Sequence, residues 1–412
     1  MGALRELLMV LFAFVANAAD EACETSKLPR IAYLISAHDR ATLVSAGRLL
    51  DVIYDPENFY VLHVDSKYRD VDRSLTDAMA LNRANVEVDQ IYDVRWARWS
   101  MIEPTLWGMG VALKARADWE VFINLSGDSW PVLTPTALRR RLQSIKLLNF
   151  VTSAPSCPTG LRPTARSEFG EGWHKKQAYP HPMLKAEPTL EAYYGSQWMI
   201  LSRPFVEYVV SELERPDSIS AQLREWFLNG WIDVEGVGRV RPHIPDETFF
   251  PSVLMHSAEF NTTAPPPVQV VEGEAMFASF YIRMDEHYPW SAQNQRYVSL
   301  DLDKPERPWG PYYLGAYDLG DVKKMKALFL RKVSVAVDAN IFKVLPVSSF
   351  ADVPDLSWPK HGRLAVSSPS NFRTVSRGSD EGCVRVSESI HCPPNHNLRP
   401  DVQDALRAAD EL

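Results

Sequence analysis

The sequence predicts an α/β fold in which a mostly parallel sheet carries helices on both faces. Apolar runs of strand length alternate with segments of helical periodicity, and the runs are at 30–38, 59–65 and 119–125. Strands that are apolar throughout are typical of a parallel sheet covered on both faces. With 46% apolar and 23% charged residues in 412, the composition is that of a globular chain, neither disordered nor built of many membrane spans.

Each element of the N-terminal half is justified by its local pattern. The first apolar run ends at His38, and helical periodicity follows from 42 to 53. The second run precedes a short strand expected at 86–88. A helix is predicted over 101–117, with Pro104 near its first turn, where proline is tolerated. The third run closes with Ser-Gly-Asp at 126–128, and an amphipathic helix is expected at 138–147.

The second half of the chain is less regular. Residues 152–194 are rich in Pro, Gly, basic and aromatic residues, which indicates a long irregular insertion. Order resumes with a strand at 196–201, a helix through Leu213 and a last ordered block at 314–342. We therefore expect a leader at 1–19, a linker at 20–29, one catalytic-size domain at 30–345 and a loosely ordered, Pro/Ser-rich tail at 346–412.

The leader has the pattern of a secretory signal peptide or a short signal-anchor. Residues 7–15 are continuously apolar, and Ala16-Asn17-Ala18 matches a small-x-small cleavage site. The apolar stretch is shorter than the ~20 residues of a spanning helix, which favours cleavage. Either alternative predicts the secretory pathway, in the Golgi or ER lumen or secreted, with membrane association only through this segment.

The four cysteines leave the disulfide pattern open, because four allow three pairings. Cys383 and Cys392 are close enough in sequence to close a small loop. Asn261 begins an Asn-Thr-Thr glycosylation triplet. Asn124 fits the same pattern, but it lies in an apolar strand and is expected to be buried.

Charge and missing motifs exclude several functions. With 44 basic and 52 acidic residues the net charge is −8, which argues against a nucleic-acid partner. The sequence contains no phosphate-binding P-loop, no complete dinucleotide fingerprint, no His-Glu-x-x-His helix and no Gly-x-Ser-x-Gly elbow. Kinase, zinc-protease and nucleophile-elbow hydrolase functions are therefore not supported.

Polar residues gather where the predicted strands end. His38 ends the first run, His63 and Asp65 end the second, and Asp128 follows the third. Ligands of open parallel sheets bind at the carboxyl ends of the strands. We therefore expect the site at this edge of the sheet.

A series of motifs in fixed order resembles the core-2/I-branching enzyme and peptide O-xylosyltransferase family, glycosyltransferase family 14. The resemblance covers about residues 30 to 342. The segments that carry it are 30–38, 60–67, 94–100, 118–127, 195–202, 244–254, 259–263, 314–319 and 328–332. It implies a GT-A-type nucleotide-sugar-binding fold and inverting transfer from a UDP-sugar to a hydroxyl in the lumen. It also implies no required metal cofactor, as in the core-2 branch.

Inverting transfer needs a base for the attacking hydroxyl and positive charge for the departing diphosphate. Glu247, in Pro-Asp-Glu-Thr-Phe-Phe, matches the family's catalytic base. The alternative is that Glu247 only caps a helix beginning near Thr248, although Asp246 is the better candidate for that cap. Arg331 and Lys332 match the family's basic pair, in which Lys332 would contact the diphosphate in place of a metal. A solvated basic turn is the alternative for them.

Further donor-side residues follow from the resemblance. His63, Asp65 and Lys67 match the first nucleotide block, where Asp65 would hold uracil or ribose unless nearby amides satisfy it. Trp96 falls in the block where the family has Trp-Gly or Trp-Ser, although Ala-Arg-Trp follows it here. Asp128 is expected near the donor or acceptor.

The acceptor-side candidates are Trp173, Lys175, Tyr281 and Arg283, and a solvated loop is the alternative for the first two. Asp301-Leu302-Asp303 has the spacing of a metal clasp, but its position indicates a solvated turn, so no metal ligand is assigned. The donor sugar is xylose, N-acetylglucosamine or glucuronic acid, with 245–254 closer to the xylosyltransferase branch. Two other functions stay open: a lumenal carbohydrate- or nucleotide-binding protein with weak turnover, and a glycoside hydrolase.

Overall fold

The computed structural model describes residues 28–68, 73–151, 193–230, 245–263 and 313–355, and the backbone of short strands elsewhere. No helix within these ranges is long and apolar enough to cross a bilayer. Several predictions lie outside the described residues: the leader at 1–19, most of the insertion and tail, Trp173, Lys175, Arg283, Asp301, Asp303, Cys383 and Cys392.

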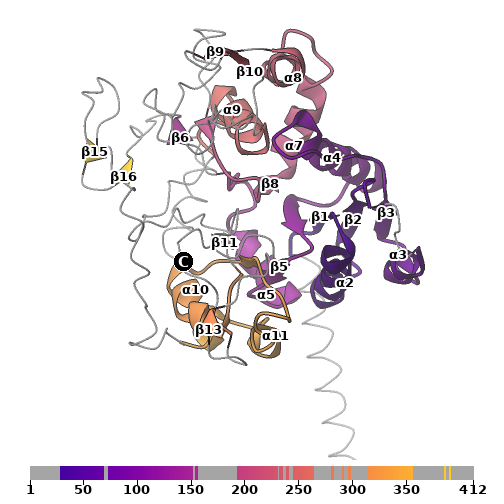
Figure 1. Ribbon diagram of the computed structural model, residues 1–412, viewed down its shortest axis with the longest axis vertical. Coiled ribbons are helices and arrows are strands. Elements are labelled where there is room, and N and C mark those ends of the chain that lie inside the picture. The colour runs from indigo at the N-terminus through magenta and orange to yellow at the C-terminus, as the bar shows by residue number, and fades with distance from the viewer. Residues whose placement is uncertain are drawn as a thin grey trace, which may run out of the picture.

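The central sheet has five strands in the order β3-β2-β1-β4-β8 (Figure 1). Strands β1 to β4 are parallel neighbours, and β8 runs antiparallel to β4. Their bounds are β1 Ile31–Ala37, β2 Phe59–Val64, β3 Val86–Asp89, β4 Val121–Ser126 and β8 Ile200–Ser202. The predicted fold class, a mostly parallel sheet with helices on both faces, is confirmed.

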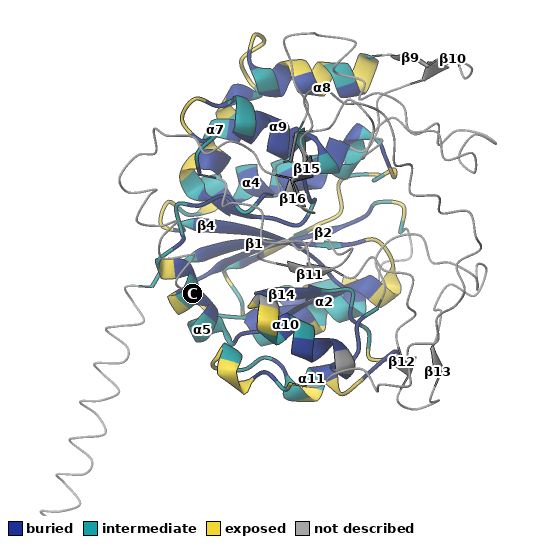
Figure 2. Cartoon of the chain, turned by 90° about the vertical axis from the view of Figure 1, so that its left-hand side faces the viewer, coloured by how far each residue is buried: buried dark blue, intermediate teal, exposed yellow. Residues whose placement is uncertain are grey.

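Two layers of helices cover the sheet, one on each face (Figure 2). One layer contains α2 Arg40–Ile53, α5 Pro135–Gln143, α10 Leu319–Met325 and α11 Ile341–Val344. The other contains α4 Glu103–Ala115, α7 Arg203–Glu212, α8 Ile219–Asn229 and α9 Phe249–His256. Successive residues of β1 alternate between them: Tyr33 and Ile35 belong to the core under α2, whereas Ala32 and Leu34 belong to the core under α4.

The remaining elements are short. The helical ones are α3 Arg73–Ala80, η1 Trp99–Met101, η3 Pro245–Glu247, η4 Ala316–Asp318 and η5 Phe350–Asp352. The strands are β5 Ser129–Pro131, β6 Ala154–Pro155, β7 Tyr193–Tyr194, β9 Ile232–Val234, β10 Gly238–Val240, β11 Phe280–Ile282, β12 Trp290–Ser291, β13 Arg296–Tyr297, β14 Phe329–Arg331, β15 Arg385–Val386 and β16 Ser389–Ile390.

Caps and prolines explain where the helices differ from the predicted bounds. Helix α2 begins at Arg40, earlier than expected, because the Asp39 carboxylate accepts a hydrogen bond from the Thr42 amide at 2.7 Å. Helix α5 begins at Pro135, whose fixed φ suits a first helical position. The helix predicted from residue 101 is divided into the 3-10 turn η1 and α4, with Pro104 in the first turn of α4.

A second sheet, β11-β14-β5, brings the C-terminal block to the end of β4. In it Arg331 of β14 pairs with Ser129 of β5. Residues 346–355, assigned from sequence to the tail, pack on this region, since the Val347 amide donates to the Val132 carbonyl at 2.9 Å. Val353 is 1% exposed.

Gly127 sits where a side chain has no space, in the turn that follows β4. A Cβ there would lie 2.1 Å from the Thr42 carbonyl oxygen. We expect Gly127→Ala to lower the free energy of unfolding by about 3 kcal/mol, because backbone must move to relieve the clash. The matched control is Gly110→Ala in α4, where an added Cβ meets nothing within 4 Å. That change should raise the stability by about 1 kcal/mol. Urea unfolding measures both, and equal stabilities would contradict the turn geometry.

Candidate active site

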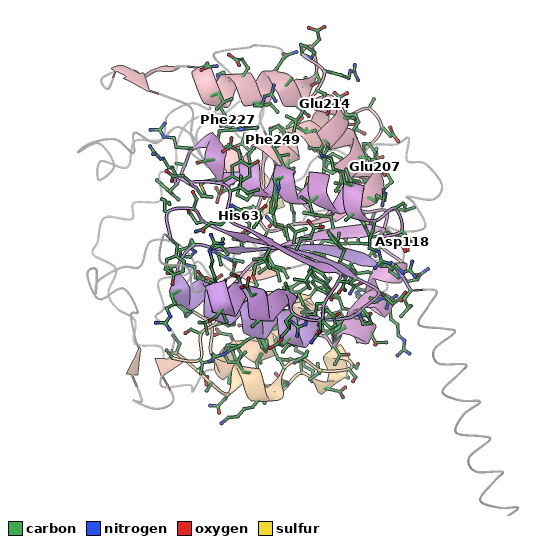
Figure 3. All side chains as sticks on the ribbon, turned by 90° about the vertical axis from the view of Figure 1, so that its right-hand side faces the viewer. His63, Asp118, Glu207, Glu214, Phe227 and Phe249 are labelled. Carbon is green, nitrogen blue, oxygen red and sulfur yellow. The ribbon has the colours of Figure 1, made fainter. Side chains whose placement is uncertain are left out.

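The carboxyl ends of the parallel strands form one polar edge of the sheet. Ser36 of β1 pairs with His63 of β2 on one side and with Ser126 of β4 on the other, so the three ends lie level. In Figure 3, His63 marks this edge, and Asp118, which precedes β4, marks the opposite one. The predicted gathering of His38, Asp65 and Asp128 at one edge therefore follows from the register.

Asp65 connects the end of β2 to the segment after β3 through hydrogen bonds. Its Oδ1 accepts hydrogen bonds from the amides of Lys67 (2.9 Å) and Val94 (3.4 Å), and its side chain is 3% exposed. The Lys67 ammonium lies 3.3 Å from Oδ2 and also donates to the Val94 carbonyl. Oδ1 is thus engaged by nearby amides, as in the structural alternative considered from sequence, and Lys67 is half-exposed beside it.

His63 of β2 also binds the segment after β3. The imidazole is 1% exposed, and its Nε2 accepts a hydrogen bond from the Tyr92 amide at 3.3 Å. Its ring centre lies 5.8 Å from that of Tyr92 and 6.0 Å from that of Trp107. Burial lowers the pKa of His63 to about 4, so the ring is neutral at neutral pH and Nε2 is free to accept.

This lowered pKa predicts an acid-sensitive stability. Protonation favours the unfolded chain, so the contribution is complete above the unfolded pKa of 6.5 and is lost as the pH falls towards 4. We expect a loss of about 3 kcal/mol across this window. His63→Gln keeps an acceptor for the Tyr92 amide without a titrating ring. Urea unfolding at several pH values should give this variant the flatter profile, and parallel profiles would exclude His63 as the source.

A buried cluster of charged residues lies at the end of β4. Arg331 Nε donates to Ser126 Oγ at 2.8 Å and lies 3.5 Å from Asp128 Oδ1. Ser126 Oγ also donates to Asp128. The Arg331 guanidinium carbon lies 4.2 Å from the ring centre of Trp198, and the side chains of Arg331 and Asp128 are only 14% and 7% exposed. Arg331 is therefore held on one side by a carboxylate and on the other by an aromatic face.

Lys332 differs from Arg331 in its contacts. Its carbonyl accepts from the Leu314 amide at 2.8 Å, and its ammonium lies 5.7 Å from the ring centre of Tyr313. Among the residues that the structure describes, it has no ion pair, and Asp128 and Asp39 act on it only at longer range. Burial and the charge of Arg331 lower the pKa of Lys332. Burial raises the pKa of Tyr313 to about 12, so its hydroxyl stays protonated.

Glu247 ends the 3-10 turn η3 and is half-buried. Its carbonyl accepts a hydrogen bond from the Gly195 amide at 2.8 Å, and Trp198, three residues further on, lies against Arg331. A short connection therefore joins the Glu247 turn to the charged cluster. The expectation that Asp246 caps the following helix is wrong: Thr248 occupies the N-cap of α9, because the 3-10 turn takes up residues 245–247.

The aromatic segment after Val94 divides into an exposed and a buried part. Trp96 is 61% exposed, whereas Trp99 is 6% exposed and contacts Phe249 edge-on. Between them Ala97 has φ of 61°, a conformation that favours glycine. The position therefore suits the Trp-Gly pattern of the resembling family, with alanine in the place of glycine.

The acceptor-side predictions are placed only in part. Of the four residues only Tyr281 falls in the described backbone, on β11, where it pairs with Leu330 next to Arg331. Asn261 is half-buried, and Thr263 of the same triplet is 1% exposed, with its hydroxyl donating to the Phe260 carbonyl at 2.6 Å. Glycosylation at Asn261 stays a prediction. Asn124 is buried, as expected.

Three residues of this edge were missed from sequence. Trp198 lies within a motif segment, Tyr313 directly precedes one, and Asp39 follows the strand-end His38. Their positions within or next to a motif segment or a strand end were the signal in the sequence that could have identified them as site residues. Within the described ranges no three His, Cys, Asp or Glu side chains gather to hold a metal ion.

A family model described as Core-2/I-Branching enzyme matches residues 31–271. The chain belongs to this family. The matched region contains Asp65, Asp128 and Glu247 and ends before the basic pair. With the family shown, the fold is the GT-A-type fold that the resemblance implied.

Curated relatives include glycosyltransferases of two kinds. Xylosyltransferase 2 of Rattus norvegicus is 30% identical over 249 residues, covering 56% of this chain and 25% of the relative. Beta-1,3-galactosyl-O-glycosyl-glycoprotein beta-1,6-N-acetylglucosaminyltransferase 3 of the same species is 28% identical over 202 residues, covering 48% of this chain and 43% of the relative. The chain thus spans a quarter to less than half of the length of these relatives.

Solved structures give a weaker likeness. TarS of S. aureus has a TM-score of 0.26 and 13% identity, covering 52% of this chain and 57% of that one. An active-site mutant of LgtC has a TM-score of 0.30 and 11% identity, covering 68% and 86%. Nothing about substrate or mechanism follows from likeness at this level.

Proposed function

We propose that the protein is an inverting glycosyltransferase that moves a sugar from a UDP-sugar to a hydroxyl of a glycan or protein acceptor. The observation that carries the proposal is the Lys332 ammonium at the carboxyl edge of the sheet, which has no ion pair among the described residues and lies next to Arg331, whose charge is balanced by Asp128. Cations at the end of a parallel sheet suit a nucleotide diphosphate. The short connection at 195–198 brings the Glu247 turn to the same cluster.

In the proposed transfer, Glu247 and the basic pair account for the proton, the new bond and the leaving group. The Glu247 carboxylate takes the proton of the acceptor hydroxyl, whose oxygen forms the new bond to the anomeric carbon. The bond from that carbon to the diphosphate breaks, and its electron pair leaves with UDP. Lys332, with Arg331 behind it, stabilises the charge that develops on the leaving group. No metal ion is assigned to this step.

The other residues are assigned supporting roles. His63, Asp65 and Lys67 position the 92–94 segment that leads to Trp96, which is exposed for contact with the donor base. Asp128 orients Arg331. Trp173, Lys175, Tyr281 and Arg283 are proposed for the acceptor. The site is proposed to work in the lumen of the secretory pathway, with the N-terminal segment as the membrane contact.

A donor screen tests the function. The full chain is incubated with UDP-xylose, UDP-N-acetylglucosamine or UDP-glucuronic acid, with and without EDTA, and UDP release is measured. The proposal expects turnover of at least one donor in EDTA; the relatives favour the first two. Loss in EDTA with rescue by manganese would contradict the metal-free step. UDP binding without turnover of any donor would support the alternative, a carbohydrate- or nucleotide-binding protein, for which the departure of residues 96–99 from the family's sequence pattern is the argument.

A further inference from the structure

A pocket outside the strand-end cluster lies between α4, α8 and the segment that follows β3. Its volume is about 420 Å³, and it is a depression largely open to solvent, with Arg224 and Glu225 exposed. It is in the helical layer that faces Leu34 of β1, and Figure 3 shows Phe227 of α8 and Phe249 of α9 on this side of the sheet, near His63. The lining residues used below are Tyr92, Trp99, Glu103, Trp107, Arg224 and Glu225.

The aromatic walls of the pocket are held in place by the fold. The Tyr92 backbone is fixed at both ends, by its amide on His63 and by its carbonyl, which accepts from the Ser66 amide at 2.9 Å. Trp99 lies between Phe227 and Phe249, with ring centres 6.3 and 5.3 Å away. These walls therefore need little ordering when a ligand enters.

Three polar groups at the pocket have no partner among the described residues. They are the Tyr92 hydroxyl, the Glu103 carboxylate and the Arg224 guanidinium. Burial raises the pKa of Glu103, and burial together with the Glu103 charge raises the pKa of Tyr92. The fourth group, Glu225, accepts a hydrogen bond from Asn229 at 2.7 Å.

We propose that this pocket binds a neutral pyranose, as a glycan-binding site separate from the site of transfer. A sugar ring presents hydroxyls that both donate and accept, which suits an accepting carboxylate, a donating guanidinium and a phenol. Its C–H faces suit the flat, amphipathic aromatic walls. Two carboxylates against one guanidinium disfavour an anionic sugar.

Ligand-observed NMR on the full chain tests the proposal with three probes: methyl β-D-galactopyranoside, methyl β-D-xylopyranoside and methyl β-D-glucuronide. We expect saturation transfer to a neutral probe at millimolar concentration, and at least fivefold weaker binding of the glucuronide. Saturating UDP should leave the neutral-probe signal unchanged. No transfer to either neutral probe at 10 mM, or displacement by UDP, would overturn the proposal, the latter because the pocket would then belong to the donor site.

Matched variants locate the binding. Glu103→Gln and Tyr92→Phe each remove one polar interaction and keep the shape, and each should weaken the neutral probe five- to tenfold. Glu214→Gln, an exposed carboxylate at the end of α7, should leave the probe affinity unchanged. Thermal melting confirms that the variants are folded. Unchanged affinity in both pocket variants would overturn the assignment. Lys332→Ala separates the two sites, since it should weaken UDP without affecting the pyranoside.

Discussion

Glu247→Gln is expected to lower kcat for sugar transfer by about 10²- to 10⁴-fold. The amide keeps the size of the side chain but cannot take a proton from the acceptor hydroxyl. Affinity for UDP should stay within about twofold, because the proposed diphosphate contacts come from Lys332 and Arg331. UDP release with the best donor gives kcat, and calorimetric titration with UDP gives the affinity.

Two controls make this result specific to the proposed base. Glu259→Gln changes an exposed carboxylate beyond the end of α9 and should keep wild-type kcat. Thermal melting of Glu247→Gln should match the wild type. A wild-type kcat in this variant would assign the base to another residue, and loss of UDP binding together with kcat would indicate an architectural role.

The fold class could be predicted because its signal is local and repeated. The strands β1, β2 and β4 are continuous apolar runs, and burial on both faces requires that pattern. Helix starts were less predictable because single residues decide them. Asp39 extends α2 towards its N-terminus by capping, and the 3-10 turn at 245–247 moves the N-cap of α9 past Asp246 to Thr248.

The candidate site was predictable as a set of residue types at strand ends, but not as a set of contacts. The resemblance implied a basic pair, Arg331 and Lys332, with Lys332 contacting the diphosphate, but it did not show how the surroundings of the two residues differ. Their difference depends on the pairing of β14 with β5, which brings Arg331 to Asp128 and Ser126 from a distant part of the chain. Trp198 reaches the same cluster from a third segment, just before β8. These contacts join residues that are far apart in the sequence, so no local sequence pattern predicts them.

The basic pair should therefore separate in experiment. Lys332→Ala is expected to reduce kcat/KM by about 10²- to 10³-fold and to weaken UDP binding, because it removes the ammonium that we propose to contact the leaving group. Its thermal stability should be close to that of the wild type, since no described carboxylate loses a partner within ion-pair distance. Lys324→Ala, an exposed lysine whose ammonium is 3.4 Å from Asp321, is the matched control and should change neither quantity.

Arg331→Ala should behave in the opposite way. It leaves Asp128, 7% exposed, without its cation and exposes the face of Trp198, so we expect a loss of about 3 kcal/mol in the free energy of unfolding. Replacing both members of the ion pair, Arg331→Met with Asp128→Asn, should recover part of that stability but not the lost activity. Urea unfolding and donor turnover, measured on the same preparations, test the predicted losses of stability and activity. If Lys332→Ala were the unstable variant and Arg331→Ala the stable, slow one, Arg331 would be the residue that meets the diphosphate and Lys332 its support.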